Sequence, residues 1–545
     1  MTNEKCAVCG VPAGQRCAGC QQVTYCGRDH QRQHWKDAHR NECRCYKVIH
    51  NPVLGRHLVA TRAIRKGETI YRDEPLVLGP KMASSPMCLG CNRNLAPRVV
   101  SDARKEFYCC RRCRWPLCGP SCEAAPNHTE ECRLLSSSSY RPQITFHDDD
   151  PHRKESAYCV IVPLRAILLK RKDSKRYTKL LTLQSHIESR IDTPLYGVLK
   201  HNLVPFIRNI LGMQEISETE ILHIAGIMDT NSYEIRAPEK DIKIRALYEL
   251  GAMMSHNCRP NTKHYFDQKL KLVLVATVDI PKDEVISISY TQPLQATIQR
   301  RYAIKQAKCF ECCCDRCKDP TEFQTYTGAI ICPNCAKAKV VAVDPLSFRS
   351  NWQCEDKKCS YRETAQENVA RNETFRATIL GLPKDSPDGY ERFLEANGAV
   401  LHPWNTNMLQ VKYALVQLYG SKLKGFSVCD LTESQLWRKV NLCIELLKVA
   451  DWLEPGLSTF RAKLLIQLRD VLLVLREQIG LQFDSTEVCP LSAGRDARTS
   501  KCQTKGEKNS PKNLPPPGQT LKQLLESSQR EIDEMIKSDP TLKRE

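Results

Sequence analysis

Cysteine and histidine recur along the chain at the close spacings that bind zinc. The chain has 545 residues, of which 30 are cysteines. Its N-terminus is polar and reaches a cysteine pair at once, which is not typical of a signal peptide. We therefore expect an intracellular protein of the nucleus, the cytoplasm or both. In a reducing compartment, this cysteine density indicates metal binding rather than a disulfide framework.

The first 43 residues hold eight candidate zinc ligands. These are Cys6, Cys9, Cys17, Cys20, Cys26, His30, His39 and Cys43. Eight ligands suffice for two tetrahedral zinc ions. The segment is too short for a hydrophobic core of its own, so metal binding would supply its folding free energy.

A second cluster repeats the same ligand order with a longer first gap. Its ligands are Cys88, Cys91, Cys110, Cys113, Cys118, Cys122, His128 and Cys132. The repeated order predicts a second finger of the same type, although "WPLC" stands where the first has "YC". Two more zinc ions are expected here.

Two further clusters bring the expected total to about six structural zinc ions. The run "CFECCCDRC" supplies three ligands, Cys312, Cys314 and Cys317. A fourth must come from elsewhere, and Cys258 in "MMSHNCRPN" is the candidate. The last cluster has the spacing of a small zinc ribbon, with free thiols as the alternative, and consists of Cys332, Cys335, Cys354 and Cys359.

Hydrophobic patterning predicts the elements that carry these clusters. Alternation of apolar and polar residues predicts strands within 54–80 and 270–290, with a turn at "PKDE". Helical spacing predicts helices within 160–230 and 365–480. The second set reads as paired helices without a clean repeat period, so a plain helical bundle stays open. No apolar run of about 18 residues is present, and a membrane span is not expected.

Several motifs together resemble the SET and MYND domain lysine methyltransferases. They are "GRHLVATRAIRKGETI", "TNSYEI", "SHNCRPN", "ISISY" and the cysteine run after "CF", in family order. Two cysteine pairs followed by "YC", "HW" and a closing H-x3-C resemble a MYND finger. The extra N-terminal finger is most similar to an arthropod-specific branch of the family.

The resemblance implies an α+β multidomain chain with a SET domain of small β-sheets closed by a pseudoknot. The expected parts are an N-terminal MYND finger (1–45), a first SET segment (46–87), a second MYND-type finger (88–132), a helical insertion (133–245), the SET core (246–292), a post-SET zinc cluster (293–320), a zinc-ribbon-like segment (321–362), a tetratricopeptide-like helical domain (363–485) and a disordered tail (486–545). Within that tail, "QTLKQLLESSQREIDEMIK" is expected to form at most a short exposed helix.

The resemblance also implies how ligands and cofactor are held. In the first finger, one zinc would take Cys6, Cys9, Cys26 and His30, and the other would take Cys17, Cys20, His39 and Cys43. Tyr290 matches the family's catalytic tyrosine, which orients the substrate lysine amine. The residues expected to bind S-adenosylmethionine are Leu54, Gly55, Arg56, Asn231, Ser255, His256, Tyr290 and Phe310.

Two residues depart from the family pattern at this expected site. His57 stands where the family has a glycine, so a side chain is expected where backbone normally approaches the cofactor. Ser255 stands where the family has an asparagine, and a hydroxyl cannot replace both functions of an amide. Losing one or two such hydrogen bonds would weaken cofactor binding by about 1–3 kcal/mol.

Three functions are compatible with these patterns. The first is a methyltransferase that modifies lysine in histone tails or other proteins. The second is a weak or inactive scaffold that binds proline-rich protein partners through its MYND fingers. The third is a nucleic-acid-binding zinc protein, which the formal net charge of +19 permits. Base-reading fingers and basic helices are missing from the sequence, so specific nucleic-acid binding is not expected.

Overall fold

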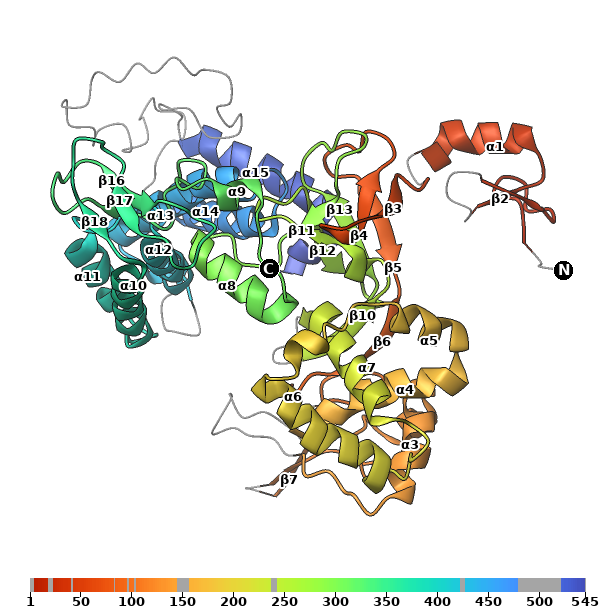
Figure 1. The fold of residues 1–545 in the computed structure, drawn as a ribbon. Coiled ribbons are helices and arrows are strands. Elements are labelled where there is room, and N and C mark those ends of the chain that lie inside the picture. The colour runs from red at the N-terminus through yellow and green to blue at the C-terminus, as the bar shows by residue number, and fades with distance from the viewer. Residues whose placement is uncertain are drawn as a thin grey trace.

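The computed structural model describes the chain in ten segments. The segments are 4–17, 23–40, 43–82, 84–95, 98–101, 104–144, 156–236, 243–421, 427–478 and 521–544. Figure 1 shows the first finger at the right, a central strand region and a lobe of helices below it, with a second helical lobe at the left. Among the described helices, none is both long and apolar enough to cross a lipid bilayer.

The strand region consists of small sheets, as the sequence predicts. Its strands are β3 (Tyr46–Asn51), β4 (Gly55–Ala60), β5 (Thr69–Asp73), β6 (Pro75–Pro80), β9 (Tyr233–Arg236), β10 (Lys243–Tyr248), β11 (Ser255–His256), β12 (Thr262–Phe266), β13 (Leu272–Ala276) and β14 (Ser287–Ile288), with the turn η7 (Gly251–Met253) before β11. The sheet orders are β6-β10-β9, β12-β13-β5 and β3-β4, and β11 pairs with β14 in parallel. Strand β13 is buried along its whole length, which makes it the centre of this region.

A lobe that contains the second finger lies between β6 and β9 in the chain, and we call it the second-finger lobe. Its elements are β7 (Arg98–Ser101), β8 (Arg104–Glu106), η2 (Pro120–Ala124), α3 (Pro126–Ser137), η3 (Ser156–Val160), α4 (Ile161–Lys172), α5 (Ser174–Leu181), η4 (Glu188–Arg190), α6 (Pro194–Val198), η5 (Leu199–Leu203), η6 (Phe206–Ile210) and α7 (Glu218–Asn231). The expected helical insertion to residue 245 is too long. Helix α7 ends at Asn231, because the alternating residues that follow pair as β9 and β10 beside β6.

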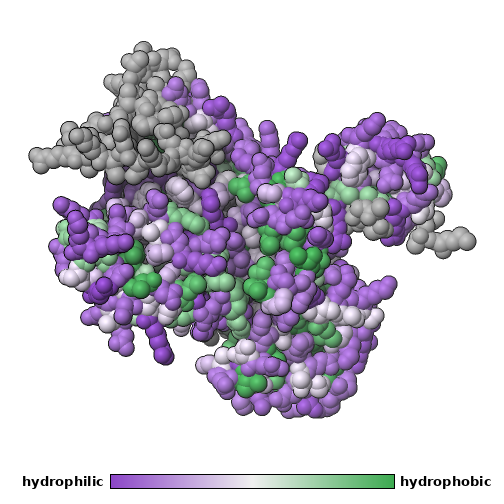
Figure 2. Space-filling model, turned by 45° about the horizontal axis from the view of Figure 1, so that its top comes forward, coloured by the Kyte–Doolittle hydropathy of each residue, from purple (hydrophilic) through white to green (hydrophobic). Residues whose placement is uncertain are grey.

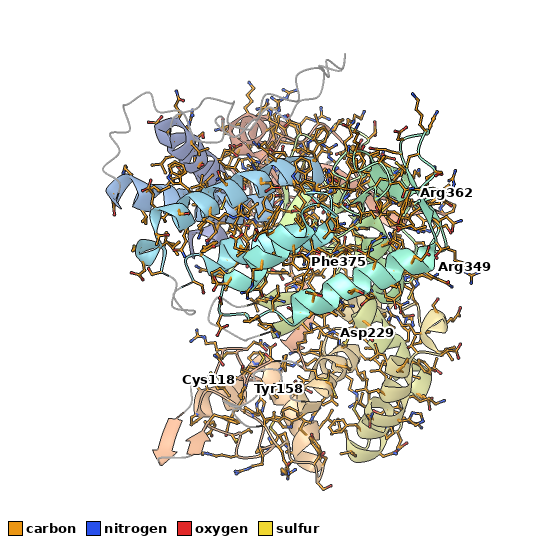
Figure 3. All side chains as sticks on the ribbon, turned by 90° about the vertical axis from the view of Figure 1, so that its left-hand side faces the viewer. Cys118, Tyr158, Asp229, Arg349, Arg362 and Phe375 are labelled. Carbon is orange, nitrogen blue, oxygen red and sulfur yellow. The ribbon has the colours of Figure 1, made fainter. Side chains whose placement is uncertain are left out.

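The second finger is built into the main hydrophobic core. Four of its cysteines (Cys88, Cys110, Cys113 and Cys132) and the fully buried Trp115 belong to the same cluster of buried residues as the strand region and α4. Arg165 of α4 donates to both carboxylate oxygens of Glu131 at 2.6 and 2.7 Å and to the backbone oxygen of Leu89. Figure 3 shows Cys118 and Tyr158 in this lobe, well apart from Phe375 in the other helical lobe. This finger is therefore a fixed part of the core rather than a free module.

The first finger has only a small core of its own. It contains β1 (Gln15–Arg16), β2 (Thr24–Tyr25), α1 (Arg28–His34) and the π-helical turn η1 (Trp35–His39). Its buried hydrophobic residues are three cysteines and Tyr25, and they form a cluster separate from the main core. Trp35 lies at the surface, 39% exposed, with its ring edge against His39. The first finger thus exposes its tryptophan, Trp35, whereas the tryptophan of the second finger, Trp115, is buried.

The C-terminal lobe joins the ribbon-like segment and the helices in a second large core. Its elements are α8 (Thr297–Lys308), α9 (Asp315–Lys318), β15 (Ile330–Ile331), β16 (Lys339–Ala342), β17 (Trp352–Cys354), β18 (Arg362–Glu363), α10 (Ala365–Leu380), α11 (Asp388–Asn397), α12 (Thr406–Leu418), η9 (Val428–Asp430), α13 (Glu433–Leu453), α14 (Thr459–Gln478), α15 (Leu521–Ser538) and η11 (Pro540–Arg544). Thr364 and Thr432 begin α10 and α13 with capping boxes, which satisfy the first amides of each helix. In Figure 2, hydrophobic surface gathers near the middle of the visible face, where the lobes meet.

The expectation of a disordered tail is wrong for the end of the chain. Residues 521–544 form α15 and η11, and Leu524, Ile532 and Met535 are buried in the C-terminal core. Glu531 pairs with the buried Arg461 at 2.8 Å. The apolar residues recur on one face of the helix, and this face packs on α14. The rest of the predicted tail, up to residue 520, lies outside the described residues.

We expect Met535→Ala to destabilise the C-terminal lobe by about 2–5 kcal/mol, because it removes a buried side chain and leaves a cavity. The denaturant midpoint of the full-length protein measures this loss. Lys537→Ala, on the exposed side of the same helix, is the control and should change the midpoint little. Equal midpoints for the two variants would contradict the packing of α15.

Candidate active site and zinc centres

The sulfur atoms of the cysteine clusters have the spacing that a shared zinc ion requires. Tetrahedral ligands at about 2.3 Å from one ion lie about 3.8 Å from one another. The Sγ–Sγ distances are 3.9 Å for Cys258–Cys312, 3.6 Å for Cys110–Cys132 and 3.8 Å for Cys335–Cys354. None of the cysteines within the described segments takes part in a disulfide. The donor sets therefore fit zinc.

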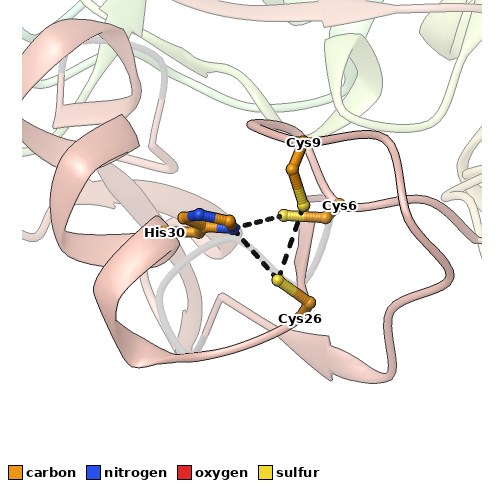
Figure 4. Close-up of side chains that lie close together, drawn as sticks. All are labelled: Cys6, Cys9, Cys26 and His30. Carbon is orange, nitrogen blue, oxygen red and sulfur yellow. Dashed lines mark hydrogen bonds between the residues drawn. The ribbon is translucent and has the colours of Figure 1, made fainter.

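The structure groups the ligands as the interleaved pattern implies. Figure 4 shows the first group, in which His30 Nδ1 lies 3.0 Å from Cys26 Sγ and 3.6 Å from Cys6 Sγ. The groups of four are Cys6, Cys9, Cys26 and His30; Cys88, Cys91, Cys118 and Cys122; Cys110, Cys113, His128 and Cys132; Cys258, Cys312, Cys314 and Cys317; and Cys332, Cys335, Cys354 and Cys359. For the remaining predicted set, Cys17 and Cys43 lie 3.8 Å apart and His39 is buried, whereas Cys20 lies outside the described residues.

Buried charges surround the Cys258 group. The Arg300 guanidinium donates to Cys258 Sγ at 3.2 Å and to Cys317 Sγ at 3.5 Å, and it pairs with Glu322 at 2.6 Å. Glu322 also pairs with Arg316 at 3.1 Å, and all three side chains are buried. Burial opposes the charge on Arg300, but Glu322 and the two sulfurs raise its pKa above the ordinary value. A zinc ion with four thiolates carries a net negative charge, which this guanidinium would offset.

His256 connects the same cysteine to the expected catalytic tyrosine. Its Nε2 lies 3.1 Å from Cys258 Sγ, and its Nδ1 accepts the backbone amide of Tyr290 at 3.0 Å. Because Nδ1 is an acceptor, the ring proton lies on Nε2 and points at the sulfur. The parallel pair β11–β14 holds the two segments side by side. This pairing joins the segments at which the family resemblance implies a pseudoknot.

A cavity of about 480 Å³ opens beside this crossing. All eight residues expected to bind the cofactor line it, namely Leu54, Gly55, Arg56, Asn231, Ser255, His256, Tyr290 and Phe310. They come from the β3–β4 hairpin, the end of α7, β11 and the segments after β14 and α8. The cavity volume is in the range that small-molecule sites occupy. Residues far apart in the sequence thus form one concave site.

The β3–β4 hairpin forms one wall of this cavity through a tight turn. The Asn51 side-chain oxygen accepts the backbone amides of Val53 and Leu54, which fixes the turn. Gly55 has φ of +64°, and a Cβ atom added there would meet nothing within 4 Å. A glycine is favoured by this backbone conformation, and it leaves the wall open for a ligand.

The expectation for His57 is wrong. Its side chain does not line the cavity but is 1% exposed and turned into the hairpin. Its Nδ1 contacts the backbone oxygen of Gly55 at 2.9 Å, and its Nε2 lies 3.5 Å from the Asn51 amide. Successive residues of a strand point to opposite faces, so the side chain after Arg56 points away from the site.

Ser255 and Asn231 differ in how their polar groups are used. The Asn231 amide donates to the backbone oxygens of Gln184 and Ile227 at 2.7 and 2.8 Å, so it positions the end of α7. The Ser255 hydroxyl is buried and has no hydrogen-bond partner among the described residues. Buried polar groups are rarely left unpaired, and a ligand in the cavity would satisfy this one. The site therefore fits a polar ligand such as S-adenosylmethionine.

Tyr290 is fixed by its surroundings in a neutral form. Its hydroxyl donates to the backbone oxygen of Met254, and burial raises its pKa to about 12. The exposed ring of Phe310 lies 6.5 Å from the Tyr290 ring at the cavity rim. A neutral hydroxyl and an aromatic rim suit a cavity that excludes water.

A second cavity of about 520 Å³ lies on the other side of the same segment. Ser289 and Thr291 line this second cavity, whereas Tyr290 between them lines the first. Its remaining walls include β12 and side chains of α12 and α14, such as Tyr413 and Phe460. The C-terminal lobe therefore forms one side of a cavity that ends near Tyr290.

Comparison with known proteins agrees with this geometry. A sequence profile of the MYND finger matches residues 6–43, and a profile of the SET domain matches residues 55–291. The chain thus contains a MYND finger and a SET domain.

Its relatives share about a quarter of their residues with it. Identity is 27% over 323 residues with the SET domain-containing protein SmydA-8, isoform A, of Drosophila melanogaster, which covers 58% of this chain and 65% of that protein. It is 25% over 280 residues with the histone-lysine N-methyltransferase ASHR1 of Arabidopsis thaliana, covering 51% and 55%. It is 25% over 279 residues with the human histone-lysine N-methyltransferase SMYD3, covering 48% and 59%. The chain thus spans less than two thirds of the length of these curated relatives.

Among the cavity residues that sequence reasoning missed is Lys308 at the end of α8. It lines the cavity, and its Nζ lies 5.1 Å from the centre of the Tyr290 ring. Its position two residues before Phe310 was the available signal, since Phe310 is an expected site residue. On the sequence alone, a lysine at the end of a helix reads as an ordinary surface residue.

The ligand groups predict about six zinc ions per chain in metal analysis of the purified protein. Cys258→Ser should remove about one of them, because it deletes one thiolate of a four-cysteine set. Cys313→Ser is the matched control, since Cys313 is exposed and outside the ligand groups of the described segments. Three or fewer zinc ions in the parent protein would contradict the two-finger assignment.

Proposed function

We propose that this protein transfers a methyl group from S-adenosylmethionine to lysine side chains of proteins, histone tails included. The observation that carries the proposal is the cavity in which the hairpin glycine, Ser255, His256, Tyr290 and Phe310 meet. The histone-lysine N-methyltransferases among its relatives support the same reaction. S-adenosylmethionine supplies an electrophilic methyl group on a sulfonium.

Different residues of the cavity would bind the cofactor and orient the acceptor amine. The backbone of the Leu54–Arg56 turn and the Ser255 hydroxyl would hold the cofactor, and Phe310 would cover its flat base. Tyr290 would orient the acceptor amine through its hydroxyl, which the Met254 carbonyl already positions. The chain's contribution is alignment and exclusion of water, not acid–base exchange at the tyrosine, because the tyrosine stays neutral below about pH 12.

The second cavity supports a protein as the substrate. A lysine side chain from a bound peptide could reach Tyr290 from that side while the cofactor fills the first cavity. Separate approaches for donor and acceptor keep the two reactants in line. Nuclear and cytoplasmic proteins are both candidate substrates.

A scaffold with little activity is the second candidate, and Ser255 favours it. His57 no longer supports this alternative, because its side chain is turned away from the cavity. The exposed Trp35 makes the first finger, rather than the buried second one, the candidate for binding proline-rich partners.

Calorimetry with S-adenosylmethionine tests the cofactor site. We expect Ser255→Asn to tighten binding by about tenfold, because the longer amide offers two N–H donors and a separate carbonyl acceptor, whereas the hydroxyl offers one donor. Ser289→Asn, in the neighbouring cavity, is the control and should leave the affinity unchanged. Failure to detect binding to the parent protein at millimolar cofactor would rule out the enzyme and leave the scaffold.

Tyr290→Phe tests the catalytic assignment. We expect it to lower methyl transfer to core histones by about a hundredfold or more while cofactor affinity changes little, because only the orienting hydroxyl is lost. Transfer of radiolabelled methyl groups measures the rate. Tyr302→Phe, at an exposed position on α8, is the control. A Tyr290→Phe variant as active as the parent would remove Tyr290 from the mechanism.

A further inference from the structure

The first turn of α14 forms part of the wall of the second cavity, the one of about 520 Å³. Ser458, Thr459 and Phe460 line it there. The Ser458 hydroxyl accepts the backbone amide of Arg461 at 3.1 Å, which caps the helix. The amides of Thr459 and Phe460 have no acceptor among the described residues. A helix of 20 residues thus presents two unused amides and the positive end of its dipole at the cavity wall.

A close approach of two backbones fixes this turn against the strand region. Gly456 has φ of +78°, and a Cβ atom added there would lie 1.9 Å from the backbone oxygen of Thr277. The next residue, Leu457, donates its amide to that oxygen at 3.0 Å. Thr277 directly follows β13 and lines the same cavity. Because a side chain at Gly456 would prevent this contact, the glycine allows α14 to begin beside the end of β13.

A buried lysine without a partner lines the same cavity. Lys263 of β12 lies opposite Val275 of β13, and its side chain is 7% exposed. Its ammonium has no hydrogen-bond partner among the described residues. Burial lowers its pKa to about 8, and Asp539 of η11 partly offsets this effect, so the amine is mostly charged at neutral pH. A buried charge without a partner is costly, and an anion bound in the cavity would compensate it.

The other charged side chains of the cavity leave it with an excess of positive charge. Lys463, one turn into α14, adds a second cation to the wall. Glu454 is the acid among the lining residues. Burial raises the pKa of Glu454 to about 7, although Arg316 and the Ser458 hydroxyl oppose this shift, so its carboxyl is only partly ionised at neutral pH. Burial lowers the pKa of His264 to about 4, and this ring is therefore neutral.

We propose that Lys263 and the first turn of α14 form an anion-binding site in the second cavity, which selects protein substrates with an acidic side chain near the acceptor lysine. The inference rests on the proposed function, because the cavity that holds this site ends near Tyr290. Ser289 and Thr291 line that end, so one bound peptide can contact both places. The carboxylate of aspartate and the phosphate of phosphoserine share the required charge and acceptor oxygens.

Peptide binding to the full-length protein tests the site without requiring methyl transfer. Each probe is a fluorescent peptide of glycine, alanine and serine with one lysine, and with aspartate, asparagine or phosphoserine at one of the neighbouring positions. Fluorescence anisotropy gives the affinity of each probe. At a favoured position, we expect aspartate to bind about tenfold more tightly than asparagine, because only the carboxylate pairs with the buried ammonium. The phosphoserine probes show whether the site prefers a carboxylate or a phosphate.

Three lysine variants locate the preference. Lys263→Met should abolish the preference for the anionic probe and change the affinity for the asparagine probe little. Lys463→Met should reduce the preference by a smaller factor, and it serves as the second variant if Lys263→Met does not fold. Lys269→Met, at an exposed position in the turn after β12, is the control and should keep the full preference. A purely structural role for Lys263 would weaken the binding of all probes alike.

Transfer of radiolabelled methyl groups to the same peptides separates this inference from the proposed function. Equal affinities and equal transfer rates for the aspartate, asparagine and phosphoserine probes would overturn the anion site, while the proposed function would stand. Preferential binding of an anionic probe without transfer to any probe would retain the site and refute the enzyme. If the parent protein binds and methylates none of the probes, the inference and the proposed function both fail.

Discussion

The geometry of the site depends on the set of contacts made by one sulfur atom, that of Cys258. Three cysteines from the segment after α8, the His256 ring and the Arg300 guanidinium all converge on it. The sulfur lies in the loop after β11, whereas its partner cysteines come about 54 residues or more later in the chain. One metal-binding group therefore fastens the strand crossing to the segment that carries Phe310. Without it, the loop after β11 and the segment that carries Phe310 would lose this metal-mediated connection.

The buried ions near this group illustrate how the chain balances charge. Four thiolates around a divalent ion leave an excess negative charge, which is costly in a buried position. Arg300 and Arg316 supply positive charge, and Glu322 prevents the two guanidiniums from repelling each other without compensation. The result is a network in which each ion has a partner, and it links the zinc-binding segment to α8 and α9. The same helix α8 then delivers Lys308 to the cavity.

The sequence predicted best those features that depend on short spacings. The C-x2-C pairs and the Cys312–Cys317 run gave ligand groups that the structure brings together, because a zinc ion constrains both spacing and residue type. The sequence was less informative where tertiary packing decides which way a side chain points. His57 is an example, because the register of the β3–β4 hairpin turns its side chain away from the cavity. The final helix was expected to be short and exposed because its composition is polar overall, and only the fold shows that one face is buried against α14. Lys308 carries no motif, so only the fold shows that its amine reaches Tyr290.

The zinc-binding groups differ in the solvent exposure of their cysteines. They should therefore lose their metal at different rates. In the first finger, Cys9 and Cys26 are exposed, whereas Cys258, Cys312 and Cys317 are buried. Oxidants and competing chelators reach exposed thiolates first, so the first finger should lose its metal before the lobe that covers the cofactor cavity. Because the first finger has its own small core, its collapse need not disturb the SET domain. Oxidative stress would then unfold the first finger while leaving the cavity of the SET domain intact.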